Sequence, residues 1–382
     1  MSYMNFENTR GDALKILDNF INKEIFNYNL KRNFDYGPNN RKNVSCLSPY
    51  ITHRLITEYE TVNKVLKKHS YQKVEKFIQE IFWRVYWKGW LELRPKVWED
   101  FLEDLNSIEN NKNILKALNG ETEINCFNNW VNELKENNYL HNHSRMWFAS
   151  IWIFTLKLPW QKGAEFFMQH LFDGDAASNT LGWRWVAGLQ TKGKNYTAKS
   201  WNIEKFTNNK YKNIKLNEDA KPLTDKREYK LTELNFPYNG AQSENLIFFE
   251  NDLNIESLKL PNYKNVYYIL LNNEQRKIKL NNKVLEFKKK IVKDQLQRLK
   301  KDIQILDISD NQNLFEKIKK FDVIYPSIGE NMSFLKSLKK KKNINFNFIT
   351  RDEDIFCWKF SNKGFFNFKS NIPKIISYFK LI

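Results

Sequence analysis

The stretch DGDAASNTLGWRW, residues 173–185, places two aspartates, an asparagine and two tryptophans close together in the chain. Buried carboxylates need cationic or N–H partners, and Arg145 precedes the stretch at the start of an apolar segment. An arginine–carboxylate pair beside a ligand would orient the hydrogen-bonding groups of both. The stretch therefore predicts a polar binding site lined by aromatic side chains, with a solvent-exposed turn as the alternative.

The 382-residue chain is strongly basic, with a net charge of +18. This charge favours a polyanionic partner, nucleic acid first and an anionic membrane surface second; compositional drift toward lysine and asparagine is the alternative. The three cysteines, Cys46, Cys126 and Cys357, are too few for a disulfide framework or a four-cysteine metal cluster. No apolar run approaches a membrane span, and the N-terminus lacks the apolar part of a signal peptide. We therefore expect a soluble monomer in a reducing compartment, with no membrane or metal cluster.

All but one of the 12 tryptophans lie in residues 1–205, which marks one module. Residues 71–93 have apolar side chains at three- and four-residue intervals, and residues 143–158 are apolar nearly all round, so both segments predict helices. We therefore predict an all-α domain over residues 1–205. The polar residues 206–243, which lack periodicity, predict a linker or an extended surface segment.

Residues 244–382 have a different pattern, in which short β-rich runs alternate with helical stretches such as 282–302. The order strand, long helix, strand is typical of a parallel βαβ unit. The predicted strands are 245–250, 265–271, 303–308, 321–325 and 343–350. SIGEN, residues 327–331, is too weak a match to a glycine-rich phosphate loop. The predicted fold class is α+β multidomain, an all-α domain followed by a small, parallel, Rossmann-like α/β domain.

His141 and His143 lie two residues apart in YLHNHSRM, residues 139–146. With Asp173 and Asp175 they would form a metallohydrolase site, but histidines at this spacing on a helix point to different faces. The favoured interpretation is that these residues cap and position a helix end.

Two other patterns leave alternatives open. Ser45 and Ser48, in NVSCLSPY at residues 43–50, precede a helical run, where hydroxyl and N–H groups either hold phosphate or simply cap the helix. The aromatic excess predicts core packing first, then base stacking beside a basic surface, then electron transfer to a redox cofactor. Its members are Trp83, Trp87, Trp160, Trp183 and Trp185.

Four stretches together resemble the FAD-binding domain of the photolyase/cryptochrome family. They are SCLSPYI (45–51), QEIFWRVYW (79–87), YLHNHSRM (139–146) and FFMQHLFDGDAASNTLGWRW (166–185). The last stretch is highly specific, whereas the serine segment alone would be weak. The resemblance covers residues 33–187 and implies a flavoprotein whose active cofactor is reduced FAD.

The resemblance implies which residues hold the FAD. Asp173 and Asp175 match residues that hydrogen-bond the isoalloxazine and nearby groups, Arg145 pairs beneath the ring, and Asn179 faces flavin N5. An amide at that position accepts from N5–H of a reduced flavin or donates to N5 of an oxidised one. The other cofactor-binding positions that it implies are Tyr36, Ser45, Leu47 and Ser48.

A chain of tryptophans for electron transfer follows from the same resemblance. Trp183 and Trp160 match the inner two members, which reduce the flavin under light. The outer member does not align cleanly, and Trp98 and Trp90 are the candidates.

The resemblance further implies a damaged-DNA substrate. Glu80 matches the carboxylate that hydrogen-bonds a cyclobutane pyrimidine dimer, and Trp83 and Trp185 match the aromatic walls that pack against it. Enzymes that repair (6-4) photoproducts have histidines at the positions of Asn142 and Met146. The main hypothesis is therefore a light-driven photolyase, a carbon–carbon lyase, that repairs cyclobutane dimers in UV-damaged DNA.

Some positions depart from the family pattern. Val44 replaces a threonine and Cys46 a common arginine, so the predicted phosphate site is thinner than usual. The family's N-terminal antenna domain has no room before residue 33, and the chain resembles short, N-terminally truncated bacterial proteins of this family. We therefore expect a cytoplasmic, nucleoid-associated protein, and whether it binds an antenna pigment stays open.

Three alternative functions follow from the same residues. The first is a cryptochrome-like blue-light photoreceptor that binds FAD without repairing DNA. The others are the metal-dependent hydrolase described above and a structural nucleic-acid-binding protein without a chromophore.

Overall fold

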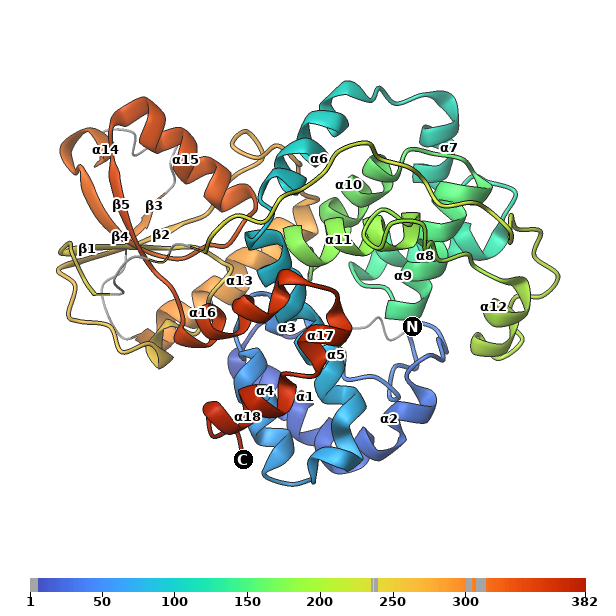
Figure 1. Ribbon diagram of the computed structural model, residues 1–382, viewed down its shortest axis with the longest axis horizontal. Helices are drawn as coiled ribbons and strands as arrows, with labels where there is room; N and C mark the ends of the chain where they lie inside the picture. Colours follow the sequence, from blue (N-terminus) through green and yellow to red (C-terminus); the bar gives the residue numbers. More distant parts are fainter. Residues whose placement is uncertain (1–5, 235, 237–239, 300–303, 307–313) are drawn as a thin grey trace. The chain divides into compact units, whose positions relative to one another are not determined.

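The structure is a computed structural model that describes residues 6–234, 236, 240–299, 304–306 and 314–382 (Figure 1). It is mostly helical and contains a parallel sheet, so the predicted α+β class is confirmed. The chain forms two compact units. Of the described residues, unit 1 contains Phe6, Asp18–Cys46 and Lys96–Tyr229, and unit 2 contains Glu7–Leu17, Leu47–Pro95 and Lys230–Ile382. These units follow contacts rather than chain order, and the boundaries at 205 and 243 stay predictions.

Unit 1 is helical. Helix α1 (Arg10–Lys23) belongs partly to it, and the others are α2 (Ile25–Lys31), α6 (Lys96–Ser107), α7 (Lys112–Asn119), α8 (Asn125–Asn137), α9 (Asn142–Ser150), α10 (Trp160–His170), α11 (Ala176–Ala187) and α12 (Ser200–Phe206). Helix α11 begins where the Asp175 carboxylate accepts hydrogen bonds from two backbone N–H groups, and it ends at Gly188, whose φ of 81° suits glycine. Its bounds are thus determined locally.

The apolar segment predicted as one helix over 143–158 has two parts. Helix α9 runs to Ser150 and continues as a π-helical turn, Ile151–Thr155. In this turn the N–H of Leu156 donates to the carbonyl of Ile151 at 2.8 Å, which is the wider π spacing. The turn is buried, as expected for a segment that is apolar on all sides.

Unit 2 contains a five-stranded parallel sheet with the order β3-β2-β1-β4-β5. The strands are β1 (Asn245–Phe248), β2 (Asn265–Ile269), β3 (Gln304–Leu306), β4 (Lys320–Ile324) and β5 (Asn345–Ile349). All five lie where the sequence predicts strands, and α13 (Asn282–Leu299) is the predicted crossover helix. The outer parts of two of these predictions, 300–303 and 307–308, lie outside the described residues.

Helices cover both faces of this sheet. Phe315 of α14 (Leu314–Lys317) and Leu335 of α15 (Glu330–Lys342) share a buried cluster with Ile247, Tyr267 and Val323 of the strands. Helix α13 lies on the opposite face (Figure 1), as right-handed crossover connections require. The C-terminal helices are α16 (Asp352–Trp358), α17 (Phe365–Lys369) and α18 (Ile372–Tyr378), and short 3₁₀ turns span Ile255–Ser257 and Lys359–Asn362.

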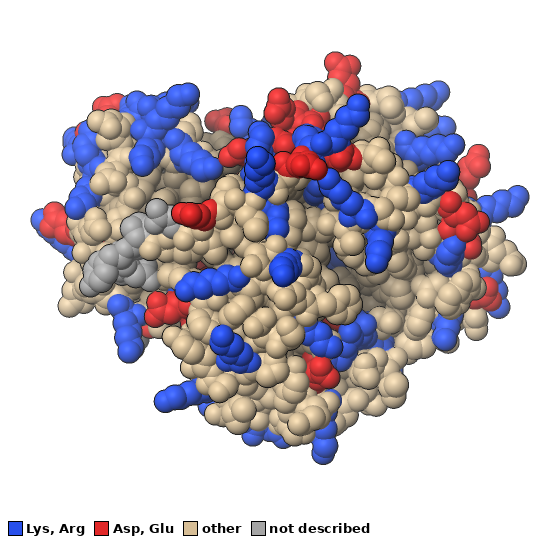
Figure 2. Space-filling model, viewed as in Figure 1, with Lys and Arg blue, Asp and Glu red and all other residues tan. Residues whose placement is uncertain are grey.

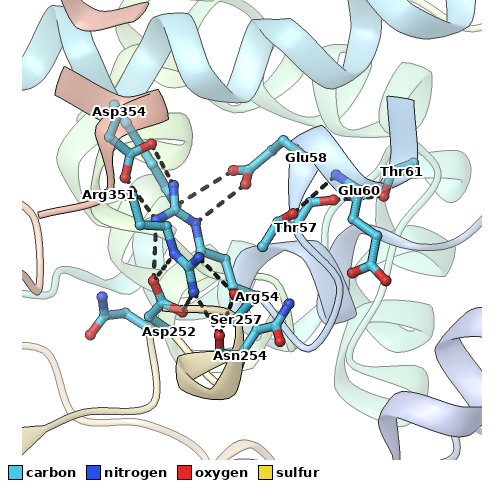
Figure 3. A network of polar contacts seen from close by, with 12 residues as sticks. Arg54, Thr57, Glu58, Glu60, Thr61, Asp252, Asn254, Ser257, Arg351 and Asp354 are labelled. Carbon is cyan, nitrogen blue, oxygen red and sulfur yellow. Dashed lines mark hydrogen bonds and ion pairs between the residues drawn. The ribbon is translucent and has the colours of Figure 1, made fainter. Parts of the chain in front are cut away.

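Three helices from the first quarter of the chain complete unit 2: α3 (Ser48–Thr52), α4 (Glu58–Leu66) and α5 (Tyr71–Glu92). Figure 3 shows the buried ionic network that joins them to the sheet side of the unit. Arg54 pairs with both oxygens of Asp354 at 2.7 Å and with Glu58 at 3.3 Å. Arg351 holds Asp252, which follows β1, through two bonds of 2.6 Å. Because all these groups are buried, loss of one partner would leave an uncompensated charge.

The end of α5 is attached to the carboxyl end of β4. The hydroxyl of Tyr325 and the N–H of Ile328 donate to the Glu92 carboxylate at 2.6 and 2.8 Å. Burial nevertheless raises the pKa of Glu92 to about 7. In doubly wound sheets this edge, where the strand order reverses between β1 and β4, is the usual ligand crevice. Here the Glu92 side chain of the same unit lies at this edge of the sheet.

The described residues between α12 and β1 form neither helix nor strand. The part of this segment in unit 1 is nevertheless packed, since Leu223 N–H donates to the Ala187 carbonyl at 2.9 Å and Arg227 pairs with Asp104 at 2.7 Å. In the described part of the chain, no helix is long and apolar enough to cross a membrane.

Candidate functional site

The centre of the candidate site in unit 1 is an ion pair between α9 and the loop before α11. The Arg145 guanidinium donates to Asp173 Oδ2 at 2.9 Å and to the Leu140 carbonyl at 2.9 Å. It also lies over the Tyr139 ring, 5.2 Å from the centroid. Asp173 is buried, with 4% of its surface exposed. The pair that the sequence predicted is therefore present, whereas the cofactor-binding role of its members stays a prediction.

Asp175 is the N-cap of α11, and Asn179 lies on the first turn of that helix. Asp175 accepts from the N–H groups of Ala177 and Ser178, so its carboxylate also serves as the helix cap. Asn179 Nδ2 donates to the Ala164 carbonyl at 2.8 Å. Because a carbonyl accepts only from N–H or O–H, this bond fixes the amide orientation and leaves Oδ1 as the group that Asn179 offers.

One face of α11 is only partly covered. Asp175, Ser178, Gly182 and Trp185 are half-buried and follow at three- or four-residue intervals, so they form one stripe along the helix. A Cβ added at Gly182 would meet no atom within 4 Å. The helix therefore has open space one turn after Asn179.

Gly182 is a residue that the sequence reasoning missed. Its neighbour Gly163 on α10 has a packing reason, since a Cβ there would lie 2.2 Å from the Trp183 ring. Gly182 has neither such a neighbour nor a positive φ. The sequence signal that could have identified it is a glycine inside a predicted helix. Glycine there makes the helix less stable than alanine would, by about 1 kcal/mol.

The predicted phosphate-binding residues are divided between the units. In unit 1, Tyr36 is 37% exposed and stacks on Phe34 with centroids 5.6 Å apart, while Ser45 is half-buried in a loop. In unit 2, Leu47 is buried and precedes α3, which begins at the half-buried Ser48. Serine at a helix start is therefore confirmed for Ser48, and the role of these residues in holding phosphate stays a prediction.

A second ionic cluster of unit 1 was not foreseen. Arg41 pairs with Asp35 and Glu133, and Ser144 of α9 donates to Asp35. Burial would lower the pKa of Arg41, but the two carboxylates outweigh it and raise that pKa. The cluster holds the first turn of α9, which begins three residues before Arg145.

His141 and His143 lie at the start of α9. His141 caps α9, since its Nδ1 accepts from the His143 N–H at 3.2 Å. Burial lowers the pKa of His141 to about 3, so the ring is neutral. Among the described residues, no group of three His, Cys, Asp or Glu side chains could hold a metal ion. The predicted capping is confirmed for His141.

The predicted electron-transfer tryptophans are buried in unit 1. Trp183 is 2% exposed and its ring lies against the first turns of α10, which begins at Trp160. Trp160 stacks on Phe101 with centroids 5.4 Å apart, and Phe101 is 5.4 Å from Trp98. Trp98 is also only 2% exposed, so the path it offers does not reach the surface at that ring. The other candidate, Trp90, is half-buried in unit 2 beneath the Arg94 guanidinium.

The predicted lesion-reading residues also occur in both units. In unit 1, Asn142 is exposed and Met146, one turn later on α9, is half-buried. Trp185 is half-buried and stacks on Tyr196 with centroids 5.7 Å apart. These side chains are therefore accessible at least in part.

In unit 2, Glu80 and Trp83 lie on α5, one turn apart. Glu80 has 24% of its side chain exposed and lies 3.8 Å from Lys76. Phe365 of α17 stacks on Trp83 with centroids 3.5 Å apart and an interplanar angle of 11°. The sequence reasoning missed Phe365, because nothing local in the C-terminal sequence connects it to α5.

Comparison with known proteins finds similarity over this part of the chain. Residues 77–216 match the family model of the FAD-binding domain of DNA photolyase. Curated proteins named deoxyribodipyrimidine photo-lyase are similar: that of Buchnera aphidicola is 31% identical over 46% of this chain and 38% of its own, and that of Agrobacterium fabrum is 31% identical over 46% and 37%. A crystal structure of a bacterial class III photolyase from Agrobacterium tumefaciens is similar over 52% of this chain and 43% of that one, with 27% identity and a TM-score of 0.46.

Residues 77–216 are thus similar to the FAD-binding domain of DNA photolyase, and the surrounding chain is similar to curated photolyases. It spans less than two fifths of the length of these curated relatives.

The residues present fit a flavin. Arg145 and the buried Asp173 form a donor–acceptor pair, and the buried Asn179 offers an acceptor on α11, next to the partly covered stripe of that helix. The open space at Gly182 lies on the same helix and would be filled by any side chain. A flat, hydrogen-bonding ring requires this combination of a polar edge and a surface without side chains.

Proposed function

We propose that the protein uses light and reduced FAD to repair cyclobutane pyrimidine dimers in DNA. The observation that carries this proposal is the fixed amide of Asn179 on a photolyase-type FAD-binding domain. When bound, excited reduced FAD supplies an electron that allows the dimer to split, and it takes the electron back afterwards. The protein binds and orients both groups.

The orientation of Asn179 favours the reduced cofactor. Its Nδ2 is engaged by the Ala164 carbonyl, so Oδ1 is available to accept a hydrogen bond. A reduced flavin has an N5–H to donate, whereas an oxidised flavin has only an acceptor there. Asn179 would therefore stabilise the form that donates the electron, without adding charge.

The lesion specificity rests on Glu80, Asn142 and Met146. Neither position on α9 has a side chain that can act as an acid near neutral pH, which a (6-4) repair mechanism would use. The Glu80 carboxylate is an acceptor for the N–H groups of a pyrimidine pair, and Trp83 follows it by one turn. A dimer is poorly stacked and paired, so flipping it out of the duplex costs less than flipping an intact pair.

The decisive experiment is chromatography of a dimer-containing oligonucleotide after illumination with chemically reduced, FAD-loaded protein. We expect restored thymines from cyclobutane dimers and none from (6-4) products. Glu80→Ala should weaken dimer binding by about 1.5–3 kcal/mol, because it removes a charged acceptor. Glu75→Ala, on the same helix, is the matched control and should bind as the wild type does. An unchanged dimer peak while the flavin cycles normally would overturn the proposal.

One observation favours a second function, a blue-light photoreceptor that binds FAD without repair. Phe365 covers one face of Trp83, the ring against which a dimer would pack. A receptor needs no open lesion pocket. In that case the purified protein would show light-driven flavin reduction but no difference in affinity between dimer-containing and undamaged DNA.

A further inference from the structure

The α/β part of unit 2 has a surface of unusual charge. Helix α15 ends in four consecutive lysines, Lys339 to Lys342, and α14 and the start of β4 add others. We call the exposed members the lysine face: Lys317, Lys319, Lys320, Lys339, Lys340 and Lys341. Figure 2 shows Lys and Arg side chains gathered over the region of α14 and α15.

Contacts within the unit bring these segments together. The Lys319 ammonium donates to the Lys342 carbonyl at 3.2 Å, so the last turn of α15 lies beside the start of β4. Lys320 pairs in register with Asn345 of β5, directly after α15. Glu316 compensates Lys342 at 2.7 Å, and Lys342 is not a member of the face. The segments that carry the lysine face are therefore neighbours in space.

Helix stability alone does not explain this surface. One or two cations in the last turn satisfy the negative end of the helix dipole, whereas consecutive lysines project about 100° apart around α15 and repel one another. Lys317 and Lys320 belong to neighbouring elements and have no part in that dipole. A surface that concentrates positive charges despite their mutual repulsion is typical of a binding site for a polyanion.

The neighbouring side chains indicate which polyanion. None of the large exposed apolar side chains of the described residues lies on α14, α15 or β4. Single-stranded nucleic acid is usually held by exposed aromatic rings on which bases stack, and a membrane-surface helix inserts apolar side chains. A surface of lysines without either device suits the phosphate backbone of a duplex, which is recognised by charge alone.

We propose that the lysine face is a contact surface for the phosphate backbone of duplex DNA, independent of sequence and of damage. It lies on the sheet part of unit 2, far along the chain from the residues assigned to the flavin and the lesion. The proposal goes beyond the proposed repair function and does not require it. Its effect would be to raise the affinity of the protein for undamaged duplex DNA.

The experiment compares two triple variants of the full-length, FAD-loaded protein. Lys339→Gln, Lys340→Gln and Lys341→Gln remove three charges from the lysine face. The matched control removes three exposed lysines of α13, on the opposite face of the sheet: Lys289→Gln, Lys290→Gln and Lys293→Gln. Binding to an undamaged duplex is measured by fluorescence anisotropy over a range of salt concentrations, after flavin absorbance and thermal unfolding confirm intact folding.

We expect the lysine-face variant to bind undamaged duplex at least about tenfold more weakly at moderate salt. The slope of log K against log salt should become less steep by about 2 to 3, because each phosphate contact contributes about 0.9. The control should keep the wild-type slope. Equal losses in both variants would assign the effect to net charge and overturn the proposal, and so would unchanged binding.

Two further measurements separate the alternatives. Sedimentation with phosphatidylserine vesicles should show no difference between the variants, and a loss confined to the lysine-face variant would indicate a membrane partner instead. Repair yield at saturating dimer concentration should stay at the wild-type level in the lysine-face variant. A failure of repair in the wild type would overturn the proposed function. The comparison of duplex binding between the two triple variants would still test the lysine face.

Discussion

Replacing Gly182 with alanine is expected to change the stability of the flavin-free protein and its flavin affinity in opposite directions. The new Cβ would meet no atom within 4 Å, so it has no steric cost in the flavin-free protein. Gly182 lies inside α11, where alanine is favoured over glycine by roughly 0.5–1 kcal/mol. The flavin-free variant should therefore unfold at a higher temperature than the wild type.

Flavin binding should weaken in the same variant. The methyl group would occupy the open space one turn after Asn179, and we expect the flavin to cover this face of α11. A tenfold increase in Kd, about 1.4 kcal/mol, is the smallest effect that we expect for a filled contact surface. Titration of flavin-free protein with FAD, followed by flavin fluorescence, measures this value.

Gly163→Ala is the matched control, because its Cβ would lie 2.2 Å from the buried Trp183 ring. That variant should lose about 1–3 kcal/mol of stability through overpacking. The pair of variants separates a glycine required by packing from one required by a ligand. If Gly182→Ala bound FAD as tightly as the wild type, the flavin would not cover this face. If it were destabilised, the inferred open space would be wrong.

Three more predictions concern other parts of the molecule. Trp183→Phe should abolish photoreduction of oxidised flavin, while the chemically reduced variant still repairs. Trp130→Phe, which changes another buried tryptophan of unit 1, should keep both photoreduction and repair. Undiminished photoreduction in Trp183→Phe would indicate another electron path. Glu92→Gln should remove a pH dependence of the free energy of unfolding. Because burial raises the pKa of Glu92 from 4.5 to about 7, its contribution to stability is full below pH 4.5. That contribution falls by about 3 kcal/mol as the pH rises through 7. Denaturant unfolding of both proteins from pH 4 to 8 measures the difference, and parallel curves would contradict it. Phe365→Ala should leave FAD binding unchanged and weaken dimer binding a few-fold by releasing Trp83, whereas tighter dimer binding would mean that Phe365 occupies the place of the lesion.

Much of the fold could be predicted because its signals are local. The β-rich runs of the C-terminal part and the long amphipathic segment between them gave the strands and α13. The pairing of Arg145 with Asp173 was also predictable, since a buried carboxylate requires a cation and the arginine begins an apolar helix. His141 as a helix cap followed from its position before α9.

The features that could not be predicted from the sequence depend on contacts between residues far apart in the chain. Arg54 and Asp354 are separated by 300 residues, and neither lies in a motif. Phe365 and Trp83 meet because α17 packs on α5, which no periodicity in either segment indicates. Gly182 carried a weak local signal, but its meaning depends on what surrounds the helix rather than on the helix itself.

Helix α5 is held at its middle and at its end by the C-terminal part of unit 2. It carries Glu80 and Trp83, the two residues of this unit assigned to the lesion, and it ends at Glu92. The sheet holds that end through Tyr325 and Ile328, and α17 covers its middle through Phe365. An enzyme gains catalytic precision when the residues that orient its substrate are themselves held by packing and hydrogen bonds. The C-terminal part of the chain thus supports the helix on which the proposed lesion specificity depends. Substitutions that break the contacts between the sheet and Glu92 should therefore lower repair by shifting α5.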